Sequence, residues 1–209
     1  MAGRILAVLI IAGFLFWSLG PGRVFPAVNP DPNHAHADFA VWINGKQWDF
    51  SGAKYMTTEA EEEAAPAGSP KKYFHLHDGN GHVIHRHKPG LPLADFFLSI
   101  GGEMTRLEQG TIDCLSLGSL YCSGKDVSGN AVSWIMFVNG KTMAFDPTYV
   151  FDDDDKILLS YGQNQPEVFA HELSLMTNDA CLYSKTCPQR GPAPTESCIA
   201  DPDVPCKMP

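Results

Sequence analysis

Two Asn-Gly dipeptides, each set between short segments of alternating apolar residues, constrain the fold more than any other feature of this sequence. They lie in WINGKQWDFS, residues 42–51, and in FVNGKTMAFD, residues 137–146. Asn-Gly favours the two-residue turn that joins antiparallel strands, because both central positions of that turn need a positive φ. We therefore predict a hairpin at 36–50 and a second, similar hairpin around the later copy.

The remaining patterns predict an α+β fold that is rich in strands. Amphipathic spacing predicts one short helix within 91–102 and another at 167–180. The acidic stretch 57–72 has room for one or two helical turns and is interpreted as a solvated excursion. A buried strand is expected at 156–161. The predicted fold class is thus a β-rich ectodomain of hairpins with two short helices, placed after an N-terminal membrane helix.

Five of the eight histidines fall within FHLHDGNGHVIHRH, residues 74–87. Successive side chains of a strand point to opposite faces, so the two histidines of an H-x-H pair share a face. The stretch holds two such pairs, His75 with His77 and His85 with His87.

The loop between these two pairs decides whether they meet. If 79–81 forms a three-residue loop with Gly81 in the left-handed conformation, His75 lies directly opposite His85. All four imidazoles would then share one face. A loop of another length would shift the register and send one pair to the opposite face.

A third H-x-H pair, His34 and His36, stands at the start of another expected strand. Neutral imidazole is the commonest metal ligand, and metal–nitrogen bonds of roughly 2.0–2.1 Å require ligands that converge. Imidazole ligation suits zinc, copper or nickel better than magnesium or calcium. We predict a zinc or copper site centred on His75 and His77 of the first hairpin strand and on His85 of the strand opposite. The full set of candidate ligands is His75, His77, His85, His87, His34 and His36.

The six cysteines fall as three close pairs, and pairing within each is the simplest arrangement. An even count without C-x-x-C knuckles indicates disulfides in an exported chain rather than zinc ligands. The predicted bonds are Cys114–Cys122, Cys181–Cys187 and Cys198–Cys206.

An apolar run at 5–19 reads either as an uncleaved membrane anchor or as a secretory signal segment. We favour the anchor, because no clean small-residue cleavage site follows. Either way the rest of the chain leaves the cytoplasm, as a single-pass membrane protein or, if the leader is cleaved, as a secreted one. The predicted divisions are an anchor or signal at 1–22, a proline-rich spacer at 23–33, a metal-binding ectodomain at 34–187 and an irregular, disulfide-stapled tail at 188–209.

Several classes of function lack support in the sequence. The net charge of −9, without a cluster of Lys or Arg, argues against nucleic acid. His171-Glu172 begins like a zinc-protease helix, but Leu175 stands where the second histidine is required. The acidic run 152–155 lacks the spacing of a calcium loop and is interpreted as a solvated turn. Nucleophile-elbow and phosphate-loop motifs are also absent.

The order of these parts resembles a family of membrane-anchored, histidine-rich envelope proteins of archaea and little-studied bacteria. The resemblance rests on an H-x-H before an apolar strand with Asn-Gly, then LHDGNGHVIH, the helix PLADFFLSIG, a V-N-G-K strand and DDKILLSYG, and it covers most of 34–187. It implies export and a shared histidine constellation, and it implies no particular activity. His82 and His87 are extra histidines that the family need not share.

Three functions remain open from the sequence. The first, which we favour, is a metal-binding envelope protein that captures, buffers or passes on copper or zinc. The second is a metalloenzyme with an open coordination position, in which Asp78 or Asp38 would act as general base. The third is a structural or partner-binding ectodomain whose histidines are incidental.

Overall fold

The chain is organised around one mixed β-sheet. The computed structural model describes residues 27–194 apart from 32, 108–111 and 164. The strand order is β10-β9-β11-β1-β4-β3, and β2 and β8 pair with β1 and β9. The strands of this sheet are β1 (Ala35–Ile43), β2 (Lys46–Gln47), β3 (Phe74–His75), β4 (Val83–Arg86), β8 (Gly124–Lys125), β9 (Ala131–Val138), β10 (Lys141–Met143) and β11 (Asp155–Gly162).

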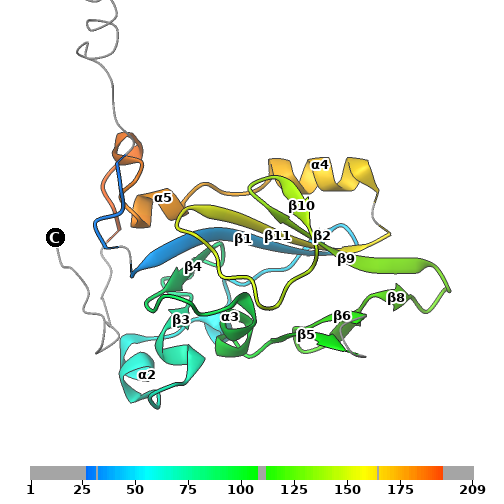
Figure 1. Ribbon diagram of the computed structural model, residues 1–209, viewed down its shortest axis with the longest axis horizontal. Coiled ribbons are helices and arrows are strands. Elements are labelled where there is room, and N and C mark those ends of the chain that lie inside the picture. The colour runs from blue at the N-terminus through cyan, green and yellow to red at the C-terminus, as the bar shows by residue number, and fades with distance from the viewer. Residues whose placement is uncertain (1–26, 32, 108–111, 164, 195–209) are drawn as a thin grey trace, which may run out of the picture.

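A smaller antiparallel sheet and four short α-helices complete the described part of the chain. In Figure 1, α4 and α5 lie on one side of the main sheet, and α3 and the small sheet lie on the other. The small sheet contains β5 (Glu103–Leu107), β6 (Ile112–Ser116) and β7 (Leu120–Cys122). The helices are α2 (Glu59–Ala64), α3 (Leu93–Ser99), α4 (Pro166–Ser174) and α5 (Ala180–Tyr183).

The two central strands, β1 and β11, run parallel and are buried along almost their whole length. A parallel pair needs a crossover connection, and here the chain between 44 and 154 provides it. The sequence predicted hairpins only, so this pairing corrects that expectation. Strands that are buried on both faces are mainly apolar, and such a run does not reveal its partner.

Alternation along β1 separates two layers of side chains. The odd-numbered residues enter the main core with α3, whereas the even-numbered residues face α4 and α5. The odd set contains Ala35, Ala37, Phe39 and Val41, and the even set contains His36, Asp38, Ala40 and Trp42. The face toward α5 is therefore the one that carries polar side chains.

Both Asn-Gly hairpins are confirmed. Asn44 and Gly45 have φ of 51° and 75°, and Asn139 and Gly140 have φ of 52° and 74°. These positive values are those of the two-residue turn that matches strand twist. The turns join β1 to β2 and β9 to β10.

The register of the histidine hairpin is confirmed, but the predicted loop is wrong. His75 pairs with His85, while the left-handed residues are Asp78 and Gly79, with φ of 57° and 69°. The Asn80 amide closes this turn by donating to the His77 carbonyl at 2.9 Å. The segment from Asn80 to His85 is longer than the segment from His75 to His77. These extra residues bring His85 opposite His75.

The helices differ in number from the two that the sequence predicted. The predicted helix within 91–102 is confirmed as α3. The segment 167–180 is divided, since α4 ends at Ser174 and α5 begins at Ala180. The excursion 57–72 holds α2, whose first turn is closed by a capping box.

Two of the three predicted disulfides are confirmed, Cys114–Cys122 and Cys181–Cys187. They indicate an oxidising environment outside the cytoplasm. Cys198 and Cys206 lie outside the described residues, as does the predicted anchor at 1–22. Within the described ranges, no helix has the length and apolar character needed to cross a membrane.

Gly81 offers a test of how tightly the histidine hairpin is held. A Cβ at this position would lie 2.6 Å from the Phe50 carbonyl carbon and the Ser51 amide nitrogen, so backbone would have to move. We expect Gly81→Ala to lower the free energy of unfolding by about 1–3 kcal/mol. Urea unfolding measures this. The matched control is Gly52→Ala, because a Cβ at Gly52 meets open space; equal effects of the two substitutions would contradict the packing.

Glu172 on α4 offers a test of pH dependence. Its side chain is buried at 1% exposure, and burial raises the pKa of its carboxyl above 4.5. The unfolded chain ionises first as pH rises, so the folded state loses stability between the usual pKa and the raised one. We expect Glu172→Gln to be more stable than the natural chain at pH 7, with the gain disappearing below pH 4. Urea unfolding at both pH values measures this difference, and Glu167→Gln is the control because Glu167 is exposed. The same pH dependence of stability in both variants would contradict the expectation.

Candidate metal centre

Strand alternation and register bring six imidazoles to the face of the sheet that α5 covers. His36 on β1 pairs with His85 on β4, and His85 pairs with His75 on β3. The intervening side chains on β3 and β4, such as Phe74 and Ile84, enter the opposite, apolar core. The remaining members of the cluster lie just outside the strands: His34 directly precedes β1, His87 directly follows β4, and His77 lies two residues after the end of β3.

Three of these histidines lie close enough together to hold one metal ion. One ring nitrogen from each of His34, His36 and His85 lies within 4.8 Å of the others. All three side chains are buried, and their exposed fractions are 8%, 1% and 0%. A tetrahedral ion would require separations of roughly 3.3 Å, so small side-chain movements would complete the convergence.

The other three predicted ligands surround this triad. The His87 ring centroid lies 4.0 Å from that of His34 and 4.6 Å from that of His75. The His77 centroid lies 4.0 Å from that of His85. The structure thus brings together all six predicted residues, but the tightest group is the triad, whereas the sequence placed the centre at His75, His77 and His85. His82 is exposed and stands apart from this face.

The hydrogen-bond partners of His36 indicate the tautomer of its neutral ring. Ser184 Oγ donates its only proton to Asp153 Oδ1 at 2.6 Å. Its oxygen must therefore accept from His36 Nδ1, which lies at 2.8 Å. This leaves the lone pair of neutral His36 on Nε2, the arrangement that orients an imidazole for metal binding.

A second chain of polar groups orients His85. Asp78 Oδ2 accepts from His77 Nδ1 at 2.7 Å, so Nε2 of neutral His77 is an acceptor. That acceptor lies 3.2 Å from His85 Nδ1. His85 therefore donates from Nδ1 and keeps its own lone pair on Nε2.

Glu62 is a member of this site that the sequence interpretation missed. Its Oε1 lies 3.0 Å from His75 Nδ1, and the two side chains are 5% and 2% exposed. The segment carrying Glu62 was interpreted as a solvated excursion, and most of its described residues are exposed, but α2 turns the Glu62 side chain inward. The signal was present in the sequence as Thr58 followed by Glu61, the spacing of a capping box.

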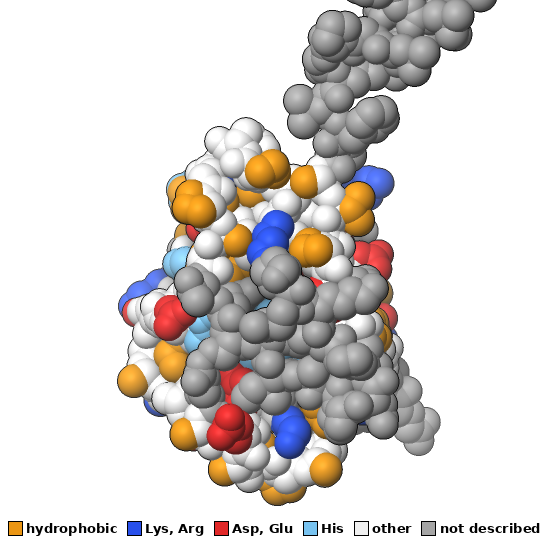
Figure 2. Space-filling view, turned by 90° about the vertical axis from the view of Figure 1, so that its left-hand side faces the viewer, with side chains coloured by type: hydrophobic (Ala, Val, Ile, Leu, Met, Phe, Trp, Pro, Cys, Tyr) orange, Lys and Arg blue, Asp and Glu red, His pale blue; other side chains and the backbone are white. Residues whose placement is uncertain are grey.

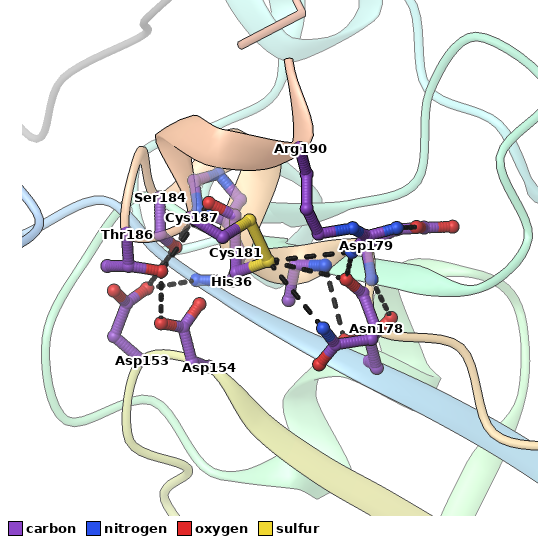
Figure 3. The surroundings of a disulfide bond; sticks show 12 residues. His36, Asp153, Asp154, Asn178, Asp179, Cys181, Ser184, Thr186, Cys187 and Arg190 are labelled. Carbon is purple, nitrogen blue, oxygen red and sulfur yellow. Dashed lines mark hydrogen bonds and ion pairs between the residues drawn. A yellow bond between two sulfur atoms is a disulfide. The ribbon is translucent and has the colours of Figure 1, made fainter. Parts of the chain in front are cut away.

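The segment around α5 covers the cluster and is fastened by a disulfide. The Tyr183 ring packs edge-on against His85, with centroids 4.7 Å apart. Figure 3 shows the Cys181–Cys187 bond next to Ser184, which reaches down to His36. In the space-filling view of this side, small areas of histidine surface are visible between other side chains (Figure 2).

The acidic run 152–155 contains the predicted turn, but several of its carboxylates accept hydrogen bonds from other elements instead of being only solvated. Asp153 accepts from the His36 amide at 2.9 Å as well as from Ser184. Asp155 is 5% exposed and accepts from Asn139 and Tyr149. Burial raises the pKa of the Asp154 carboxyl. These carboxylates hold β1, β11 and the α5 segment in one arrangement.

Asp38, a candidate general base in the sequence interpretation, has a structural role instead. Its carboxylate is 1% exposed and accepts from Thr177 Oγ1 and from the amides of Asp179 and Ala180. It therefore fixes the start of α5 on β1. The other candidate base, Asp78, orients His77.

No family model, curated protein or solved structure matches this chain. The resemblance to histidine-rich envelope proteins therefore remains an expectation.

We expect Asp38→Ala to lower the free energy of unfolding by about 3 kcal/mol, because it leaves a buried amide, a half-buried amide and a hydroxyl without their acceptor. Chemical denaturation of the full-length chain measures the loss. The control substitution is Asp49→Ala, because the Asp49 carboxylate is exposed and accepts hydrogen bonds from the neighbouring Ser51. A variant at Asp38 as stable as the Asp49→Ala control would contradict the assigned role.

Proposed function

We propose that this protein binds a transition-metal ion, zinc or copper, in an oxidising compartment outside the cytoplasm. His34, His36 and His85 are the central ligands. The observation that carries the proposal is the approach of one nitrogen from each to within 4.8 Å in a buried setting. His87 lies next to this triad, with its ring centroid 4.0 Å from that of His34.

The donor set supports zinc or copper over harder cations. Imidazole nitrogen suits both metals, whereas magnesium and calcium prefer oxygen ligands. The described cysteines are held in disulfides and supply no thiolate. Carboxylates and a hydroxyl approach the ring nitrogens on the outer side, which is how proteins fix the orientation of metal-binding histidines.

Burial favours a binding role over catalysis and over incidental histidines. The triad is buried beneath Tyr183, so a substrate has little access to a metal held there. Histidines that merely decorate a wet strand face would be exposed, and five of these six residues are buried. A cluster of buried imidazoles on one face indicates a holding site.

The test is calorimetric titration of the full-length chain, without a polyhistidine tag, with zinc and separately with copper. We expect saturable, tight binding, and a loss of affinity of about 100-fold or more in His36→Ala and in His85→Ala, since each removes a ligand. His82→Ala is the matched control, because His82 belongs to the same hairpin but is exposed.

Circular dichroism without metal establishes that the variants are folded. Bound metal should also raise the melting temperature of the natural chain, because a ligand of the native state stabilises it by about 2.7 kcal/mol at a hundredfold excess over Kd. Equal affinities for His36→Ala, His85→Ala and His82→Ala, or no tight binding by the natural chain, would overturn the proposal.

A further inference from the structure

We propose that the Cys181–Cys187 disulfide is a reactive bond that exchanges with a dithiol reductant, and that its reduction weakens metal binding beneath it. The reactivity is inferred from the surroundings of the bond, whereas the effect on metal rests on the proposed function. The bond joins α5 to the segment that follows this helix, and Figure 3 shows the polar groups around its sulfur atoms.

One sulfur atom of this bond lies against a positive charge. Arg190 Nη1 is 3.6 Å from Cys181 Sγ. The same guanidinium donates to the Asn178 carbonyl and, through Nη2, to Asp179 Oδ1 at 3.0 Å, so it is fixed in this place. A neighbouring cation stabilises a thiolate, and a sulfur leaves more readily when its negative charge is stabilised. Attack on Cys187 with departure of Cys181 is therefore the favoured direction of exchange.

A pocket beside the bond gives a reductant access to it. Cys181 and Cys187 both line this pocket, together with Leu182, Lys185 and Pro188, and its volume is about 570 Å³. Access of the attacking thiolate is one of the factors that set the rate of exchange. Lys185 is exposed and adds a positive charge that favours the approach of a thiolate.

The exchange proceeds in two balanced steps. A thiolate of the reductant attacks Cys187 Sγ, a mixed disulfide forms, and the electron pair of the broken bond goes to Cys181 Sγ. The second thiol of the reductant loses its proton, attacks the reductant's sulfur in the mixed disulfide, and releases Cys187 as a thiolate. The protein disulfide thus gains two electrons, the dithiol is oxidised to a disulfide, and two protons pass from the dithiol through solvent to the two cysteines.

The surroundings of the disulfide Cys114–Cys122 oppose such an exchange. This bond joins paired positions of β6 and β7, and Cys114 is fully buried at 0% exposure. Burial blocks attack on Cys114, and attack on Cys122 would expel a thiolate into a buried position at a high cost. The two bonds should therefore differ in their rates of reduction.

Reduction of Cys181–Cys187 would free the segment that covers the histidine cluster. The loop closed by the bond carries Tyr183, which packs against His85, and Ser184, which accepts from His36 Nδ1. The helix α5 has only four residues, and a helix this short is not stable on its own. Loss of an outer hydrogen-bond partner of a metal-binding histidine costs about 10–100-fold in metal affinity.

Limited reduction of the full-length chain tests the reactivity. The oxidised protein is treated with dithiothreitol for increasing times, alkylated, and mapped by mass spectrometry. We expect Cys181–Cys187 to be reduced about tenfold faster than Cys114–Cys122. Equal rates, or faster reduction of Cys114–Cys122, would overturn the inference.

The role of the positive charge is tested by comparing Arg190→Gln with Arg190→Lys. Both variants lose the forked contacts to Asn178 and Asp179, but only the lysine variant keeps a positive charge near Cys181. We expect reduction to be several-fold slower in Arg190→Gln than in Arg190→Lys. The same rate in both would contradict the assigned role of the guanidinium.

Zinc affinity tests the effect on metal. The double variant Cys181→Ser/Cys187→Ser replaces chemical reduction here, because a thiol reductant itself binds zinc. We expect this variant to bind zinc about 10–100-fold more weakly than the natural chain, whereas the matched control Cys114→Ser/Cys122→Ser keeps the natural affinity. Ser184→Ala removes only the contact to His36; it should weaken zinc binding in the same direction even if the double variant does not fold.

The outcomes separate this inference from the proposed function. Natural zinc affinity in Cys181→Ser/Cys187→Ser or in Ser184→Ala would overturn the effect on metal and leave the proposed function intact. A natural chain that binds no zinc would overturn the proposed function and the effect on metal together. The reactivity of the bond is decided in every case by the reduction rates of the natural chain.

Discussion

The period of two along a β-strand is the constraint on which the site depends. On β3 and β4 it directs Phe74, Leu76 and Ile84 into the main core and the alternating histidines to the other face. A slip of one residue would exchange the two sets, placing imidazoles in the apolar core and aromatic side chains beneath α5. The apolar core therefore fixes the register, and the register assembles the histidine cluster.

Segments distant in the chain then enclose and orient the imidazoles. The α5 segment contributes Ser184 and Tyr183, and Asp153 joins it to β1. The disulfide Cys181–Cys187 closes the loop that carries Ser184, and Asp38 fixes the start of α5. The Ser184 hydroxyl contacts a ring nitrogen of His36, and the other contacts hold the backbone and the covering segment, so the imidazoles keep fixed orientations.

Local patterns predicted the parts of this structure that depend on local chemistry. Asn-Gly gave both hairpins, and the H-x-H spacing gave the set of histidines that share a face. Long-range geometry was not predictable in the same way. Ser184 lies 148 positions from His36, and the parallel pairing of β1 with β11 leaves no mark in two apolar runs. Glu62 was overlooked because the acidic composition of its segment indicated a solvated stretch, although the capping box of Thr58 and Glu61 indicated a helix there.

The most direct measurement is X-ray absorption at the zinc edge on the full-length, zinc-loaded chain without a polyhistidine tag. A buried imidazole site predicts nitrogen neighbours at about 2.0–2.1 Å, the outer scattering of several imidazole rings, and no sulfur. A spectrum with oxygen neighbours alone, or with sulfur and without imidazole scattering, would contradict the assignment of these histidines as metal ligands.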